Sequence, residues 1–197
     1  MDSRQALDSF IYLEYPPPHA TWHTTEGKMK RDAASKEIIK LISTGSTTGL
    51  TASLVAERIL NARADVHFLY AAVQAVGEEG EMLTLRNPIL AKAFIDCILH
   101  PASGPSMAGD DDGFGESAER TFPRHWEVPL IGLMRLLMPY ETDDPAICST
   151  IHASILDVVN IIWEDMYVLL HGGPLGDYRR ELVSRTLTAL TAMESQR

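Results

Sequence analysis

The sequence predicts an all-α protein, folded as a single irregular bundle of six or seven helices with a long flexible acidic loop. Apolar residues recur three and four positions apart along most of the chain, which is the spacing of one helix face. Proline and glycine, often next to asparagine or aspartate, mark the places where helices should begin and end. We find no segment with the period-two alternation of a strand.

Residues 1–25 are predicted to form an N-terminal helix, near 3–14, followed by a proline-rich arm. The three consecutive prolines at 16–18 favour an extended polyproline II segment over a helix, so we place the arm at 15–25. The helical bundle domain then spans 26–197, and its first helix is expected near 26–43.

A long amphipathic helix is predicted next, over 51–76. His67 lies off its apolar stripe and is expected at the surface or at the rim of the core. The stripe follows the helical period of about 3.6 residues and consists of Val55, Ile59, Ala62, Val66, Leu69, Val73 and Val76.

The helix over 88–100 is delimited by its own sequence. Asn87 supplies an N-cap side chain, and Pro88 occupies the first helical position, where its missing N–H costs nothing. The dipeptide His100-Pro101 is a stop signal. Cys97 lies on the apolar stripe of this helix, and we interpret it, like Cys148, as an inert buried thiol.

The segment 101–125 is predicted to be a flexible loop, because it is rich in glycine, proline and aspartate. Asp110, Asp112 and Glu119 fall at positions three, five and twelve of an EF-hand calcium loop. Ala108, however, stands at position one, where the ion needs a carboxylate. A solvated acidic loop is therefore the favoured interpretation.

Two histidines offer a second place for a metal ion. His19 and His23 are four residues apart, which would bring both rings together on a helix, but they follow the three prolines. We expect them on a surface loop and predict no metal site and no cofactor. A metal-dependent protein using this pair or the acidic loop remains a third hypothesis.

Three helices are predicted in the last third of the chain. The segment 128–138 is apolar nearly all round and should be buried within the bundle. The segment 145–171 starts at an Asp-Pro step, stops before Gly-Gly-Pro and should be central. The last helix, 177–194, is amphipathic, with a stripe of Leu182, Val183, Thr186, Leu187, Leu190 and Met193.

His152 is the most conspicuous polar residue of the predicted central helix. On a helical wheel it stands at the centre of an apolar face, and a buried imidazole without a hydrogen bond is costly. The companions of His152 on that face are Leu156, Val159, Trp163, Met166 and Leu170. A second stripe, which is either solvated or a polar seam between helices, holds Asp157, Asn160, Glu164 and His171.

Composition restricts the compartment and the partners. The chain carries 17 basic and 27 acidic residues, a formal charge of −10, which disfavours nucleic acid and anionic lipid. We find no secretory leader and no uninterrupted apolar run of membrane-spanning length, so we expect a soluble, cytoplasmic protein without a membrane span. Two cysteines cannot form a disulfide framework.

Two main functions stay open, and the sequence does not decide whether the protein is an enzyme. The first is an interaction or regulatory domain with a protein partner, since no catalytic motif is present; a homo-oligomer is compatible with it. The alternative is a small cofactor-independent enzyme or ligand-binding protein with an apolar pocket between helices. It would isomerise, dehydrate or cyclise a hydrophobic small molecule. His152 would be its acid or base, and the ligand-binding residues would be Trp163, Met166, Tyr167, Asn160 and Glu164.

Overall fold

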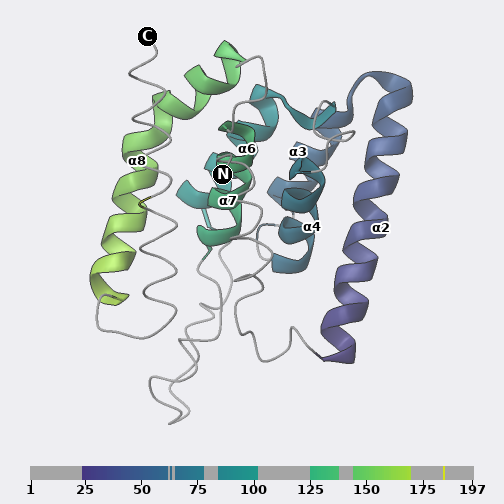
Figure 1. Ribbon diagram of the computed structural model, residues 1–197, viewed down its shortest axis with the longest axis horizontal. Coiled ribbons are helices and arrows are strands. Elements are labelled where there is room, and N and C mark those ends of the chain that lie inside the picture. Colours follow the sequence, from purple (N-terminus) through teal and green to yellow (C-terminus); the bar gives the residue numbers. More distant parts are fainter. Residues whose placement is uncertain are drawn as a thin grey trace, which may run out of the picture.

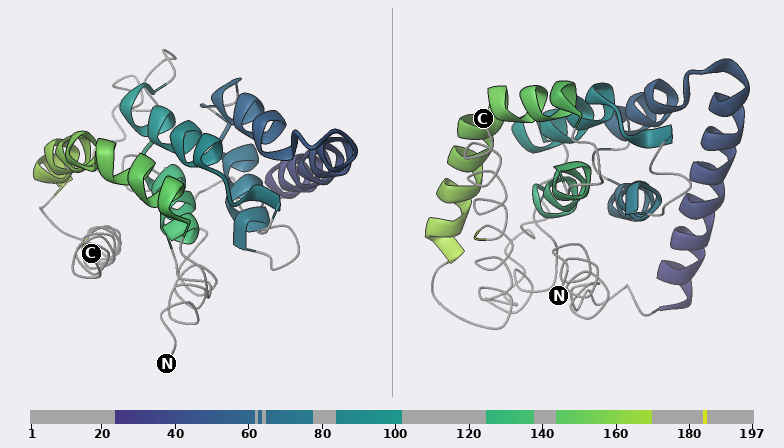
Figure 2. Two further views of the ribbon diagram at one scale, coloured as in Figure 1. Left: turned by 90° about the horizontal axis from the view of Figure 1, so that it is seen from above. Right: turned by 45° about the horizontal axis from the view of Figure 1, so that its top comes forward.

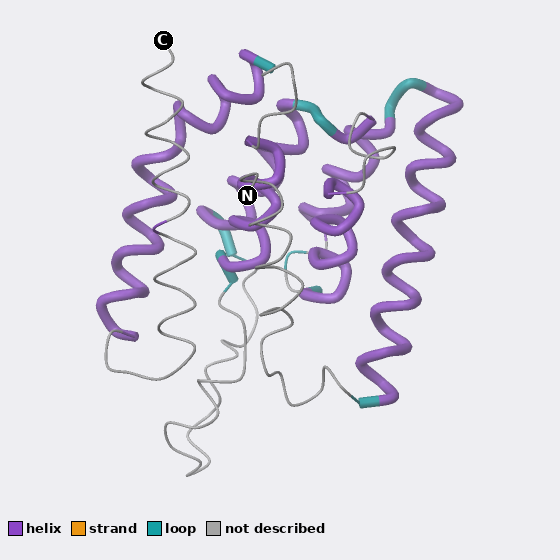
Figure 3. The backbone as a smooth tube through the Cα atoms, in the orientation of Figure 1, coloured by secondary structure: helices purple, strands orange, loops and turns teal. Residues whose placement is uncertain are grey.

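The computed structural model describes residues 24–61, 63, 65–77, 84–101, 125–137, 144–169 and 184, and the side chains of 164–169 lie outside this description. These residues are 88% helical and contain six helices and no strand, which confirms the predicted all-α fold (Figure 3). The helices are α2 (Thr25–Thr48), α3 (Thr51–Asn61), α4 (Val66–Gly77), α6 (Pro88–Leu99), α7 (Glu127–Leu137) and α8 (Pro145–Leu169).

Several predictions fall outside the described residues. They are the helices near 3–14 and 177–194, the proline-rich arm with His19 and His23, and the acidic loop beyond Pro101. The division into residues 1–25 and a bundle domain over 26–197 therefore stays a prediction.

The two longest helices lie at opposite edges of the molecule. Figure 1 shows α2 at one edge, α8 at the other, and α3, α4, α6 and α7 between them; the views in Figure 2 agree. α2 packs on α3 and α4, while α8 packs mainly on α6 and less on α7. The prediction of a central position for the helix that starts at Pro145 is therefore wrong, because α6 and α7 occupy the middle.

α2 ends at Thr48, five residues beyond its predicted end, and its last turns are rich in hydroxyl side chains that bond within the helix. Ser43 and Ser46 donate to the carbonyls of Ile39 and Ile42, both at 2.8 Å, so these residues add bonds within the helix. The helix ends at Gly49, whose φ of 70° is left-handed. The turn into α3 is tight, since a Cβ on Gly45 would lie 2.3 Å from the Cα of Thr51.

The predicted helix over 51–76 is two helices. α3 ends at Asn61 and α4 begins at Val66, and Asp65 lies between them. The Asp65 carboxylate accepts hydrogen bonds from the backbone N–H groups of His67 and Phe68, both at 3.1 Å, and so acts as the N-cap of α4. Arg63 stabilises the break by donating to the carbonyls of Leu60, at 3.0 Å, and His100, at 2.8 Å.

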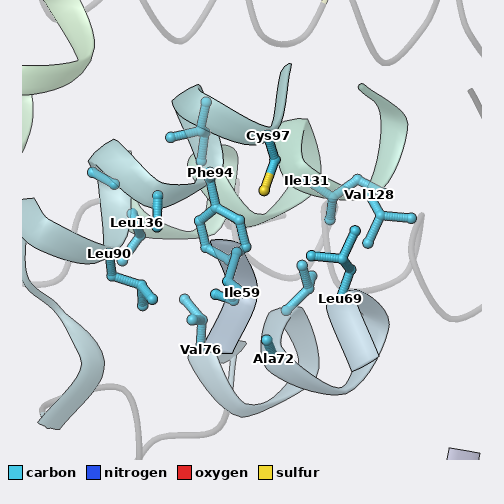
Figure 4. Packing of buried hydrophobic residues seen from close by; sticks show 14 of the residues in the cluster. Ile59, Leu69, Ala72, Val76, Leu90, Phe94, Cys97, Val128, Ile131 and Leu136 are labelled. Carbon is cyan, nitrogen blue, oxygen red and sulfur yellow. The ribbon is translucent and has the colours of Figure 1, made fainter. Parts of the chain in front are cut away.

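The core is built around α6 and α7 (Figure 4). Every residue of α7 is buried, which confirms the prediction made from its all-round apolar sequence. Phe94 of α6 is fully buried, and its ring contacts Gly132 of α7 so closely that an added Cβ would lie 2.6 Å from the ring. Trp126, immediately before α7, is the largest of the fully buried side chains. These contacts hold α6 in place as the support for α8.

Candidate functional site

The outer face of α8 is the candidate site, and the start of this helix is fixed by its sequence. The Asp144 carboxylate accepts a hydrogen bond from the Ala146 N–H at 2.9 Å, as expected of an N-cap, and Pro145 occupies the first helical position. Thr150 donates to the carbonyl of Ala146 at 2.8 Å. The helix then runs for 25 residues, about 37 Å at 1.5 Å per residue, along the edge of the molecule.

One face of α8 joins the core. Its buried side chains are Ile147, Ile151, Val158 and Ile162, which recur at helical spacing, and Ile155 packs partly against the same cluster. All five are β-branched. Since α8 contacts α6 and α7, this face attaches the helix to the body of the molecule.

The opposite face, which we name the outer face of α8, is open to solvent although it carries large apolar side chains. Leu156 is 76% exposed and Trp163 is 65% exposed. The other exposed residues on the same side are small or polar, namely Ser149, Ala153, Asp157 and Asn160. Asp157 is thus the one charged side chain among the described residues of this helix, from Pro145 to Trp163. A surface so apolar and so poor in charge is typical of a binding face.

The predicted orientation of α8 is wrong. The sequence placed Trp163 and Leu156 in the core with His152 at the centre of their face, whereas His152 is half-buried and the other two are exposed. The buried isoleucine and valine face lies about 110° round the helix from His152, at 100° per residue. α8 has two apolar stripes, and a wheel cannot tell which of them meets α6.

The remaining predicted site residues on α8 divide into two groups. Asn160, like Asp157, is exposed, which agrees with the solvated alternative for the second stripe and not with a buried seam. The side chains of Glu164, Met166 and Tyr167 lie outside the described residues, as do Leu170 and His171. The acid–base role of His152 stays a prediction. So does the ligand-binding role of the five residues proposed for it, Trp163, Met166, Tyr167, Asn160 and Glu164.

α8 also bears on the expectation that the chain has no membrane span, which it does not contradict, since one such helix is weak evidence for a span. The stretch Pro145–Trp163 is long and apolar enough to cross a membrane by length and composition, the one such stretch among the described helices. The stretch is not an uninterrupted apolar run, because His152, Asp157 and Asn160 break it. Only 22% of its most apolar window is buried, so it differs from the core helix of a soluble protein, which passes the same test but is mostly buried.

Three charged or titratable side chains are buried that were not predicted to be. Glu127 and Arg135 of α7 are 0% and 4% exposed, and His67, predicted at the surface or rim, is buried at 9%. Arg135 donates to the carbonyls of Val73 and Gln74 near the C-terminal end of α4, at 2.8 and 3.3 Å. A signal was present: a charged residue in a helix that is otherwise apolar all round must be buried with it. Within the described residues, no group of three or more His, Cys, Asp or Glu side chains could hold a metal ion.

Cys97 is buried as predicted, at 2% exposed, whereas Cys148 is only half-buried. Burial raises the pKa of the Cys97 thiol to about 12, against the smaller opposing effect of the Arg63 charge. In the unfolded chain the pKa of a cysteine thiol is about 8.5. The unfolded state therefore loses this proton first as the pH rises, and folding loses stability above about pH 8.5.

We expect the free energy of unfolding to fall with pH more steeply in the wild type than in the variant Cys97→Ala. The extra slope should approach about 1.4 kcal/mol per pH unit between about pH 9 and 11, because one proton separates the two states. Urea denaturation of both proteins at pH 8, 9, 10 and 11 measures this difference, and tyrosines and lysines common to both cancel. Parallel curves would contradict the prediction.

Comparison with known proteins gives no relative. No family model, curated protein or solved structure matches this chain. Function must therefore be argued from the exposed face of α8 and from the charges around it.

Proposed function

We propose that the protein is a non-catalytic helical interaction domain that binds another protein chain through the outer face of α8. The observation that supports this most directly is the exposure of Trp163 and Leu156, seven residues apart on one face. Tryptophan is among the residues that contribute most to binding at protein interfaces, and an exposed leucine nearby extends the apolar contact. We also propose that the protein is soluble and lies in the cytoplasm.

A protein partner is favoured over a lipid bilayer by two features of α8. Ile147 and Ile151 bury the start of the helix in the core, so a span beginning at Pro145 would have to break that packing. In addition, Asp157 would lie near the middle of the bilayer, where a carboxylate costs about 2.5–3.5 kcal/mol even on the lowest scale. A protein surface can accept Asp157 at the rim of an interface while it covers Trp163.

A photo-cross-linking amino acid at position 163 tests the proposal. In the full chain, expressed in cells, we expect discrete protein adducts from position 163 and none from the same group at Glu57, an exposed position on α3. The change Leu156→Asp should lower the yield of adducts at least tenfold. It should leave helix content and thermal stability unchanged, because an exposed residue contributes little to folding.

Two other outcomes would overturn the proposal. Adducts to lipid, with binding of the purified chain to vesicles of phosphatidylcholine and phosphatidylserine, would assign the face to a membrane. Adducts from position 163 no more abundant than those from position 57 would show that the face is merely solvated.

A further inference from the structure

α2 carries a second exposed surface, and its charge is opposite to that of the chain as a whole. Four of the five lysines in the sequence lie on this helix, at positions 28, 30, 36 and 40, and all four are exposed. α2 holds five basic and three acidic residues, a net charge of +2, within a chain of −10. Two of its acidic residues are already paired, Glu26 with Lys30 at 2.7 Å and Glu37 with Arg58 at 2.6 Å.

The unpaired lysines lie on one face together with exposed apolar side chains. At 100° per residue, Lys28, Met29, Lys36, Ile39 and Lys40 fall within about 120° of the helix circumference. Met29 is 67% exposed and Ile39 is 57% exposed. The buried residues of α2, such as Ala34 and Ile38, lie on the opposite side. We name these five exposed residues the outer face of α2.

The outer face of α8 is complementary to it. Asp157 is the one charged side chain of this face in the described part of α8, and the helix has no lysine or arginine in its sequence. Both helices also expose large apolar residues. Six such residues are exposed in the described part of the chain, and four of them belong to these two helices: Met29 and Ile39 on α2, Leu156 and Trp163 on α8.

We propose that the outer face of α8 binds the outer face of α2 on a second copy of this chain. The inference rests on the proposed function, since it names the partner of the same face. Because α2 and α8 lie at opposite edges of one molecule (Figures 1 and 2), their complementary faces meet only between copies. The contact is head-to-tail: each copy uses two different surfaces, so that association continues into open chains or closes into a ring.

The expected strength follows from size and charge. One helix packed on another buries less surface than a standard interface of about 1,600 Å², so association should be weak and should depend on protein concentration. Two copies with a charge of −10 repel each other in most orientations, and the outer face of α2 is the described surface that reverses this repulsion. The association should weaken with salt, because exposed charges are screened beyond about 8 Å at physiological ionic strength.

Matched charge reversals of the full chain test the pairing. Lys36→Glu on α2 and Asp157→Lys on α8 should each lower the apparent association constant at least tenfold in analytical ultracentrifugation. Lys92→Glu on α6 and Glu57→Lys on α3 make the same changes at exposed positions outside both faces, and they should leave self-association within twofold of the wild type. Circular dichroism confirms that all four variants keep their helix content.

Mixing the two impaired variants is the decisive arm. In an equal mixture the intact α2 of the Asp157→Lys chain meets the intact α8 of the Lys36→Glu chain, and the two altered faces also carry opposite charges. The mixture should therefore regain the self-association that each variant alone has lost. A symmetric α8–α8 pair does not give this pattern, because the change Lys36→Glu lies on α2 and would leave such a pair unchanged.

Three outcomes would overturn the inference: a wild type that is monomeric up to 200 μM, a mixture that stays monomeric, or equal effects of Lys36→Glu and its control at Lys92. The proposed function has a separate readout. Cross-links from position 163 to another protein, without cross-links to peptides of α2, would contradict the pairing of two copies. They would still support the outer face of α8 as a binding face.

Discussion

Replacing Phe94 with alanine is expected to lower the free energy of unfolding by about 3–5 kcal/mol, the range for removing a buried aromatic ring. Phe94 is completely buried in the core, with a solvent-exposed fraction of 0%. Its ring lies within the buried cluster (Figure 4) and packs against Gly132, where α6 meets α7. Urea denaturation followed by circular dichroism measures the loss.

The glycine opposite the ring provides the control. A Cβ at position 132 would lie 2.6 Å from the Phe94 ring, so Gly132→Ala alone should cost about 1–3 kcal/mol by overpacking. Combined with Phe94→Leu, whose smaller side chain vacates that space, the same change should cost at least about 1 kcal/mol less, because contacting residues are not additive. Strict additivity of the two changes would contradict the close packing of α6 on α7.

The helix starts were predictable because their causes are local. Asn87 accepts a hydrogen bond from the Ile89 N–H at 2.9 Å, and Asp144 does the same for Ala146, so both predicted Asx-Pro starts are confirmed. The break at Asp65 has an equally local cause and was overlooked because the apolar stripe of 51–76 keeps its phase across it. Periodicity identifies a face, but it does not show that the backbone is continuous.

The orientation of α8 could not be predicted because it depends on tertiary packing. A helix with two apolar stripes can turn either one towards its neighbour, and the stripe that packs is the one whose shape fits α6. In α8 this is the stripe of β-branched residues such as Ile151 and Ile162, which leaves Trp163 exposed. The error matters for function, since Trp163, which was predicted to line a pocket, and Leu156, which was predicted to lie beside it on the buried face, are the large apolar residues of the exposed outer face.

Replacing Arg135 with methionine is expected to lower the free energy of unfolding by about 2–4 kcal/mol, because hydrogen bonds from a charged donor contribute about 1.5–3 kcal/mol each. Arg135 is 4% exposed, and its guanidinium donates to the carbonyls of Val73 and Gln74, at 2.8 and 3.3 Å. These carbonyls lie near the C-terminal end of α4, where the helix dipole favours a cation. The side chain thus joins α7 to the end of α4.

A second arginine separates this role from that of an ordinary ion pair. Arg58 bonds to Glu37 at 2.6 and 3.2 Å but is one-third exposed, so Arg58→Met should cost no more than about 1 kcal/mol. Arg135→Lys keeps the charge and loses the fork of donors, and it should recover only part of the loss. If Arg135→Met were as stable as the wild type, the methionine would have replaced the buried charge without cost. The link between α7 and the end of α4 would then be apolar packing and not hydrogen bonding.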